Sequence, residues 1–276
     1  MKKYLVLGSS GVVGKALTNY IRNVGHVVYT FDIEESKFED LRITNNTLLE
    51  KYVSECDFVF FMAWDVGGSV YLQKYQNTYE FIDNNLKILT NTFEVIKKYN
   101  KPFIFASSQM ANMSYSTYGI TKALGEKVTE ALNGITVKFW NVYGIEHDLN
   151  KSHVITDFIL KAKNNKKIDM LTDGKELRQM LYDRDAAECL YELSVRYNEL
   201  PRDKDYHITG FQWNSVYEIA ETICKFYPGT TIEPGISKDT GQLDKRNEPN
   251  DYILNYWKPK TSLYNGIKYI VNHMNR

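Results

Sequence analysis

The chain of 276 residues contains few of the residues that usually mark a disulfide framework or a metal centre. Only three cysteines occur, and their spacing fits neither a zinc knuckle nor a CxxC redox pair. We expect Cys56, Cys189 and Cys224 to be reduced, buried thiols, because disulfides are rare in cytoplasmic proteins. The five histidines are scattered, with no HxxxH or HExxH spacing, so the sequence predicts no metal site.

An excess of one charge and a long apolar segment are missing as well. Lys+Arg and Asp+Glu both number 34, whereas a nucleic-acid binder usually shows a basic excess. The longest uninterrupted apolar run, Phe58–Trp64, is far shorter than the ~20 residues that span a bilayer. The basic N-terminus is interrupted at Gly8, so it is a poor signal peptide. We therefore expect a globular cytoplasmic protein that binds neither nucleic acid nor membrane.

Apolar runs and amphipathic segments alternate through the first half of the chain. Strands are predicted at residues 3–7, 26–31, 57–62, 103–106 and 136–140, and helices at 12–24, 47–54, 83–99 and 118–132. This β-α-β alternation is typical of a doubly wound parallel α/β sheet, whose helices cover both faces.

The regular alternation fades after Gly144. Helices are predicted at 154–162 and 185–197, a strand at 206–208, and a further helix that opens with the capping box Ser215–Glu218. We assign residues 1–145 to the sheet domain, with a return of the chain to it at about 178–210. Residues 146–276 then form mainly a smaller lobe over the ligand edge of the sheet.

A glycine-rich loop joins the first predicted strand to the first predicted helix. It reads Gly8-Ser9-Ser10-Gly11-Val12-Val13-Gly14, a GxxGxxG spacing. Glycines there allow a tight turn and close approach of the backbone to a pyrophosphate, which the helix N-terminus attracts. Glycines also serve purely structural turns, but the strand–turn–helix context favours a dinucleotide site. Its predicted contacts are Gly8, Ser10, Gly11, Val12, Val13 and Gly14.

An acidic residue, Asp32, ends the second predicted strand, with Ile33 beside it. A carboxylate there accepts hydrogen bonds from the adenosine ribose of NAD and repels the additional phosphate of NADP. No arginine follows directly to bind that phosphate, although Lys37 is near. The sequence therefore favours NAD, with a solvated turn aspartate as the alternative.

A YxxxK spacing occurs three times and has little value without context. Pro259 breaks the pair Tyr256/Lys260, and Tyr264/Lys268 has no serine pair upstream. Tyr118/Lys122 begins a predicted helix after a strand that ends in Ser107-Ser108, and its i,i+4 spacing puts both side chains on one face.

Oxidation of a hydroxyl group by a serine, a tyrosine and a lysine requires that the three side chains lie close together. A free tyrosine has a pKa of ~10 and is a poor base near neutral pH, but an adjacent ammonium favours its phenolate. The phenolate can then accept a proton from a sugar hydroxyl while hydride leaves the same carbon for the nicotinamide. A serine hydroxyl holds the reacting oxygen, and we expect Ser108 rather than Ser107 to face the substrate.

Taken together, these motifs resemble the extended short-chain dehydrogenase/reductases of the NAD-dependent epimerase/dehydratase family, which act on nucleotide sugars. The resemblance implies a Rossmann-type sheet with a smaller C-terminal substrate-binding lobe, and NAD as the cofactor. It further implies that Asp40, Leu41, Ala63 and Asn85 contact this cofactor together with Tyr118 and Lys122. The implied substrate contacts, for a nucleotide-diphosphate sugar, are Asn141, Val154, Arg178 and Arg246.

Four departures from the family pattern narrow the expected reaction. Phe61 stands where the family often has histidine, and only ten residues separate Ser108 from Tyr118. Gln109-Met110 replaces the Asp-Glu pair of the 4,6-dehydratases, and neither residue can act as a carboxylic acid. No cysteine lies between Cys56 and Cys189 to serve in a reductive 3,5-epimerisation.

Oxidation at the sugar C4 remains as the simplest chemistry. It gives a 4-epimerase or a 4-dehydrogenase, or in reverse a 4-keto-sugar reductase. Two other classes stay open: a catalytically inactive NAD-binding regulatory protein, and an enzyme acting on a small carbonyl compound. The resemblance also implies a homodimer formed through the helices predicted at 83–99 and 118–132.

Overall fold

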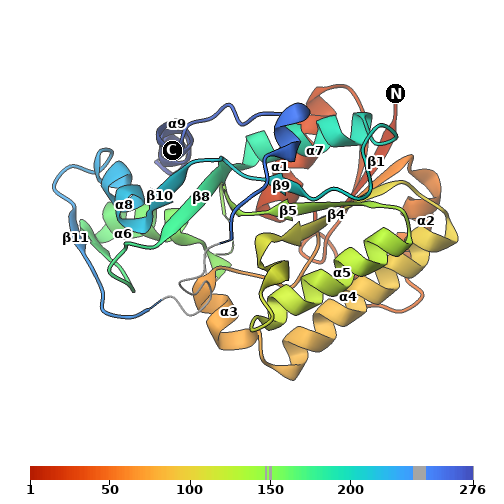
Figure 1. Cartoon of the computed structure of the whole chain (residues 1–276), viewed down its shortest axis with the longest axis horizontal. Coiled ribbons are helices and arrows are strands. Elements are labelled where there is room, and N and C mark those ends of the chain that lie inside the picture. The colour runs from red at the N-terminus through yellow and green to blue at the C-terminus, as the bar shows by residue number, and fades with distance from the viewer. Residues whose placement is uncertain (147, 149–150, 239–246, 276) are drawn as a thin grey trace.

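The computed structural model describes residues 1–146, 148, 151–238 and 247–275. Its centre is a parallel sheet of six strands in the order β2-β1-β3-β4-β5-β9 (Figure 1). These strands are β1 (Lys3–Leu7), β2 (Val27–Phe31), β3 (Phe58–Phe61), β4 (Phe103–Ser108), β5 (Ile135–Phe139) and β9 (Tyr206–Ile208). The predicted α/β class with a doubly wound parallel sheet is confirmed.

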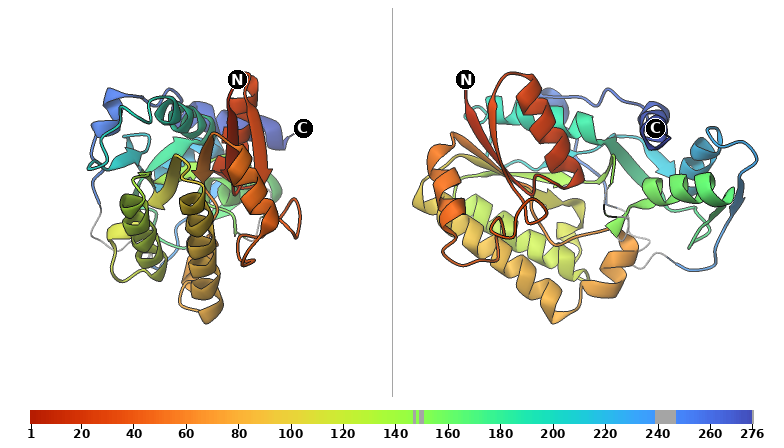
Figure 2. Two further views of the ribbon diagram at one scale, coloured as in Figure 1. Left: turned by 90° about the vertical axis from the view of Figure 1, so that its right-hand side faces the viewer. Right: turned by 180° about the vertical axis from the view of Figure 1, so that it is seen from behind.

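Helices cover both faces of this sheet, which explains why its strands are almost wholly apolar. One face carries α1 (Val12–Asn23) and α7 (Asp183–Val195), which pack against each other. The other carries α2 (Thr47–Glu55), α4 (Tyr79–Lys98) and α5 (Thr117–Ala131), as the views in Figure 2 show. Each face has its own buried cluster of aromatic and branched side chains.

The second lobe contains short strands and three helices around a core of its own (Figure 1, left). Its three-stranded sheet has the order β10-β8-β6, and β7 pairs with β11. The strands are β6 (Asn141–Tyr143), β7 (Lys167–Asp169), β8 (Leu177–Tyr182), β10 (Trp213–Ser215) and β11 (Thr231–Glu233). The helices are α6 (Val154–Asn165), α8 (Val216–Cys224) and α9 (Leu263–Met274).

The sequence prediction missed several of these elements. It left out α3 (Ser69–Tyr75), α9, the 3-10 helices η1 (Gln109–Asn112) and η3 (Tyr252–Asn255), and the short strands of the lobe. The strand range predicted at 103–106 stops two residues short of β4, whose final Ser107 and Ser108 pair with β5, in agreement with the serine pair expected at the strand end. The capping box at Ser215 and Glu218 is confirmed, since both of its reciprocal hydrogen bonds are present.

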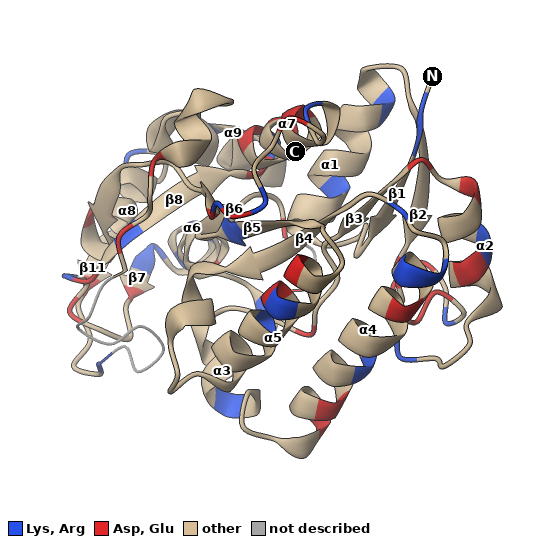
Figure 3. Ribbon diagram, turned by 45° about the vertical axis from the view of Figure 1, so that its right-hand side comes forward, with Lys and Arg blue, Asp and Glu red and all other residues tan. Residues whose placement is uncertain are grey.

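The remaining features of the described residues concern disulfides, metal clusters, membrane-spanning helices and charge. The three cysteines form no disulfide, but Cys224 is only half-buried, because α8 turns it partly toward solvent. No group of His, Cys, Asp or Glu within the described part of the chain is arranged to hold a metal ion. Over the same residues, no helix has the length and apolarity needed to cross a membrane. Lysines alternate with acidic residues along α4 and α5 (Figure 3).

Candidate active site

A cleft of about 930 Å³ runs along the carboxyl edge of the central sheet and extends toward the second lobe. Ligands of open α/β sheets bind at this edge, where strand order reverses. The cleft brings together the glycine loop, the residue after β2, the segment after β3, the end of β4 and the start of α5. Most of the cofactor contacts predicted from sequence therefore line one continuous space.

The glycine loop has the shape that a close backbone approach requires. Gly8 adopts φ +84°, and a Cβ there would collide with the backbone of Ala63. A Cβ on Gly14 would collide with the carbonyl oxygen of Gly8. Gly11 is the N-cap of α1 and has no side chain to cap the first N–H groups of the helix. Those donors and the positive end of the helix dipole are free for a diphosphate, so the loop fits NAD.

Asp32 stands beside the loop at the end of β2. Its Oδ2 accepts a hydrogen bond from the Ser10 N–H at 2.9 Å, and its Oδ1 accepts one from the Glu34 N–H at 3.0 Å. These backbone donors fix the carboxylate at the rim of the cleft, which Ile33 also lines. A fixed carboxylate at this point suits the hydroxyls of a ribose and disfavours an additional phosphate.

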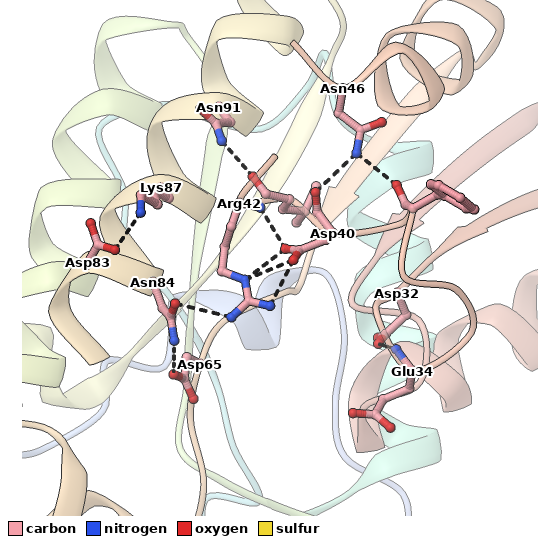
Figure 4. Close-up of polar contacts among 12 residues, drawn as sticks. Asp32, Glu34, Asp40, Arg42, Asn46, Asp65, Asp83, Asn84, Lys87 and Asn91 are labelled. Carbon is pink, nitrogen blue, oxygen red and sulfur yellow. Dashed lines mark hydrogen bonds and ion pairs between the residues drawn. The ribbon is translucent and has the colours of Figure 1, made fainter. Parts of the chain in front are cut away.

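The predicted adenine contacts, Asp40 and Leu41, line the same end of the cleft. The Arg42 guanidinium binds Asp40 through Nε at 2.9 Å and Nη2 at 2.8 Å, and reaches the Asn84 Oδ1 at 3.2 Å (Figure 4). Burial acts to raise the pKa of Asp40, but the hydrogen bonds from Arg42 outweigh it and hold that pKa below its usual value. The sequence analysis did not single out Arg42, whose contact with α4 depends on the fold.

Asn85 occupies a different place from the one its predicted role implies. It is fully buried and is absent from the cleft lining, whereas its neighbour Asn84 lines the cleft. Its side chain accepts from the Asp65 N–H at 2.8 Å and donates to the Asp65 carbonyl at 3.1 Å. Asn85 therefore anchors the segment after β3, in which Ala63 and Trp64 do line the cleft.

Tyr118 and Lys122 lie on the buried face of α5, and both line the cleft. The Lys122 Nζ is 6.0 Å from the centre of the Tyr118 ring and donates to the Ala106 carbonyl at 2.6 Å. Burial raises the pKa of Tyr118 to about 12, against the opposing effect of a hydrogen bond with Ser108. Burial also holds the pKa of Lys122 well below its ordinary value, although the Glu126 carboxylate opposes this. Both groups are thus biased toward their neutral forms.

The two adjacent serines of β4 have different partners. Ser108 interacts with the Tyr118 hydroxyl, and its Oγ accepts from the Met110 N–H at 3.1 Å. The Ser107 Oγ donates to the Glu126 Oε1 at 2.5 Å, and Glu126 is paired with the buried Lys138 at 3.3 Å. Ser107 lines the cleft, but its hydroxyl is engaged away from Tyr118. The arrangement favours Ser108 as the partner of the tyrosine.

The predicted substrate contacts are not gathered in the cleft. Asn141 donates to the Gln179 carbonyl at 3.3 Å, and Val154 packs against the core of the lobe. Arg178 lies on β8 and donates to the neighbouring Leu177 carbonyl at 2.8 Å. None of the three is among the residues that line the cleft. Arg246 falls outside the described residues.

Sequence reasoning missed a hydrogen-bonded pair, Glu146 and His153, at the substrate end of the cleft. The Glu146 Oε1 lies 2.5 Å from the His153 Nδ1, and its Oε2 accepts from the His153 N–H at 2.9 Å. Burial acts to raise the pKa of Glu146, but the contacts with His153 outweigh it and lower that pKa. The two residues are seven apart in sequence, and His153 is the N-cap of α6, so no periodic pattern could have indicated the contact.

The fold, and a cleft with a tyrosine–lysine pair at one end, are those expected of a dinucleotide-binding oxidoreductase. Comparison of the sequence with known protein families identifies the family. The chain belongs to the NAD dependent epimerase/dehydratase family, whose model matches residues 4–209. NAD is accordingly the cofactor, as the sequence predicted.

Several known proteins are similar to this chain. GDP-L-fucose synthase of Dictyostelium discoideum is 26% identical over 229 residues, which cover 71% of each chain. UDP-glucose 4-epimerase of Thermotoga maritima, solved with UDP-glucose, superposes with a TM-score of 0.81 at 18% identity, covering 99% of this chain and 98% of the other. A GDP-6-OMe-4-keto-L-xylo-heptose reductase from C. jejuni gives a TM-score of 0.83 at 19% identity, covering 99% and 97%. These structural likenesses establish the fold.

Proposed function

We propose that the chain is an NAD-dependent nucleotide-sugar oxidoreductase that acts at the sugar C4 hydroxyl, as a 4-epimerase or a 4-dehydrogenase. The observation that carries the proposal is that Tyr118 and Lys122 line one end of the cleft that holds the cofactor loop, with Ser108 next to the Tyr118 hydroxyl just behind the lining. A catalytically inactive sensor has no need of all three groups.

Ser108, Tyr118 and Lys122 each have a separate role in the proposed reaction. The Ser108 hydroxyl holds the reacting oxygen next to the Tyr118 hydroxyl. Tyr118 accepts the proton as general base, and a charged Lys122 on the same helix face favours the phenolate. When bound, NAD supplies the hydride acceptor and a positive charge close to these groups. That charge opposes the effect of burial, which alone keeps Tyr118 protonated.

The substrate is held beyond these residues, where the cleft reaches the second lobe. Trp140, Glu146 and His153 line this end and provide an aromatic surface and polar groups suited to a sugar. We place the nucleotide diphosphate against the lobe, with Arg178 and Arg246 as its guanidinium ligands, because planar guanidinium groups match phosphate oxygens. In this proposal Arg178 turns toward the cleft when the substrate binds.

A panel of UDP-, GDP- and dTDP-sugars tests the function, with NADH followed at 340 nm and the products identified by mass spectrometry. A dehydrogenase accumulates NADH, whereas an epimerase converts the sugar without net NADH. Mass spectrometry of compounds that co-purify with the protein identifies the first sugars to try. Absence of turnover and of binding across the panel would contradict the proposal.

A second candidate, reduction of a 4-keto sugar, is favoured by one of the similar proteins. The C. jejuni protein that superposes on this chain is a reductase of a GDP-linked 4-keto heptose. The same Ser108, Tyr118 and Lys122 would then deliver a proton to the C4 oxygen. Oxidation of NADH by a nucleotide 4-keto sugar, with no reaction of the 4-hydroxy sugars, would select this function.

We also propose a homodimer formed by α4 and α5, which lie side by side at the surface (Figure 2). Their outer faces expose Leu86, Ile120 and Leu124. A paired four-helix interface would bury these side chains. Sedimentation equilibrium of the protein and of Ile120→Glu tests this proposal, because a charge in the interface should leave a monomer.

A further inference from the structure

Trp64 is a large aromatic residue at the point where the cofactor cleft meets the catalytic helix. It follows Ala63 directly after β3 and lines the cleft together with Lys122. Its ring packs against Phe61 at 6.3 Å and Phe105 at 5.7 Å between ring centres. The tyrosine and lysine motif gave no reason to expect an aromatic partner from β3.

The face of the Trp64 indole packs against the ammonium group of Lys122. The Nζ lies 3.9 Å from the centre of the Trp64 ring, well within the ~6 Å range of a cation–π contact. The same Nζ donates to the Ala106 carbonyl at 2.6 Å. An ammonium has three N–H donors, so these two contacts leave one donor for a ligand in the cleft.

Hydrogen bonds made by the next residue, Asp65, fix the position of Trp64. Asn85 accepts from the N–H of Asp65 and donates to its carbonyl, so both backbone groups of the next residue are anchored to α4. The Asp65 side chain accepts from the Tyr71 hydroxyl at 2.6 Å and from Asn84 at 3.0 Å. A segment held at this many points presents the indole in one orientation.

We propose that Trp64 is a positioning residue for Lys122. Its indole face and the Ala106 carbonyl hold the lysine charged and aimed into the cleft, where the ammonium binds the cofactor and supports Tyr118. The inference rests on the proposed function, because it assigns Trp64 a purpose through the catalytic role of Lys122. Burial favours the neutral form of a lysine that is 3% exposed, and the indole face offsets part of that effect.

The groups that face Lys122 give the direction of the pH effect. Tyr118 and Glu126 face it from α5, the Ala106 carbonyl and the Phe105 ring from β4, and Trp64 from the segment after β3. An indole face stabilises the charged form of a lysine. Without it, the pKa of Lys122 falls further, so the ammonium is lost at a lower pH.

The test compares Trp64→Leu, which removes the aromatic face, with Trp64→Phe, which retains one. NAD affinity is measured by calorimetry across the neutral to alkaline range. We expect Trp64→Leu to bind NAD about tenfold more weakly, the size of a desolvated cation–π contact, and to lose affinity at a lower pH than the parent protein. Trp64→Phe should stay within about threefold, because the Nε1 it removes has no partner among the described residues.

A double-mutant cycle separates this role from a merely structural one. In a Lys122→Met background, Trp64→Leu should weaken NAD binding no further, since the group it positions is gone. Trp213→Leu, an indole outside the cleft lining, serves as the control and should bind NAD like the parent protein.

Each contrary result points to a different failure. Three results would overturn the role of Trp64 and leave that of Lys122 unaffected. They are equal losses of NAD affinity in Trp64→Leu and Trp64→Phe, additive losses of NAD affinity in the double variant, and parental NAD affinity in Trp64→Leu. Parental NAD affinity together with parental hydride transfer in Lys122→Met would overturn the role of Lys122, and with it both the proposed mechanism and this inference.

Discussion

The cofactor end and the substrate end of the cleft differ in how their polar groups are held. At the cofactor end, Asp32 accepts two backbone N–H groups and Asp40 is paired with Arg42. At the substrate end, Glu146 accepts from the His153 N–H, but the predicted ligand Arg178 lies outside the cleft lining and donates to the Leu177 carbonyl. The first end is organised before any ligand arrives, whereas we expect the second to be completed by the substrate.

Tyr118→Phe gives the largest expected effect and tests the point where the two ends meet. The change removes one hydroxyl and leaves the cofactor end intact. Hydride transfer should fall by at least ~10²-fold, the lower end of a general acid–base contribution, while NAD affinity is kept. Single-turnover reduction of bound NAD by a nucleotide sugar measures it, with Tyr264→Phe as a control of parental rate. Unchanged hydride transfer in Tyr118→Phe would leave only the cofactor-binding half of the proposal.

Arg178→Ala tests whether the substrate end is completed by the ligand. Loss of a charged hydrogen bond should weaken nucleotide-sugar binding by ~1.5–3 kcal/mol, or roughly 10- to 150-fold, without changing NAD affinity. Calorimetry with a nucleoside diphosphate measures the effect. If that affinity is unaffected, Arg178 is a surface residue and the lobe binds phosphate elsewhere.

The preference of the protein for NAD over NADP tests the role of Asp32 at the cofactor end of the cleft. The fixed carboxylate should make the protein bind NAD at least about tenfold more tightly than NADP, since the additional phosphate would meet a like charge. Calorimetry with both cofactors decides this, and Asp32→Asn should narrow the preference. Equal or tighter NADP binding by the parent protein would remove the role assigned to Asp32.

Asp183 gives the smallest expected effect and lies at the junction of the two halves. Burial raises the pKa of its carboxyl to about 6, and its Oδ1 has no hydrogen-bond partner among the described residues. Because the folded-state pKa lies above the unfolded value, ionisation removes stability as the pH rises from about 4 through about 6.

Asp183→Asn should therefore stabilise the protein at pH 8 by about 1–2 kcal/mol, and by less at pH 5. Thermal unfolding at both pH values measures the difference. An equal shift at the two pH values would show that ionisation of Asp183 is not its cause.

The same contrast explains what could be predicted from the sequence. The glycine loop, Asp32 and the pair Tyr118/Lys122 are short-range patterns, each within one strand–turn–helix unit or one helix turn. Their periodicity and spacing can be recognised in the sequence alone, and the structure brings these residues into one cleft.

The features that escaped prediction depend on contacts between distant segments. Trp64 meets Lys122 across 58 positions of sequence (122 − 64), and Asn247 donates to Gln109 across 138. The short lobe strands, such as β6 and β10, have only three residues each, too few to show an alternating pattern. Helix α9 did carry an amphipathic signal, in Ile267, Ile270 and Val271, that the sequence reading did not use.

The late arrival of β9 at the edge of the central sheet has a consequence for biosynthesis. During translation at ~5–20 residues per second, β5 leaves the ribosome several seconds before Tyr206–Ile208. Until then Val137 and Phe139 belong to an open strand edge, which is a template for mispairing with other chains. The cluster beneath the sheet is completed only by Ile253 and Trp257. The nascent protein therefore needs nearly its whole length before this strand edge and this cluster are both covered.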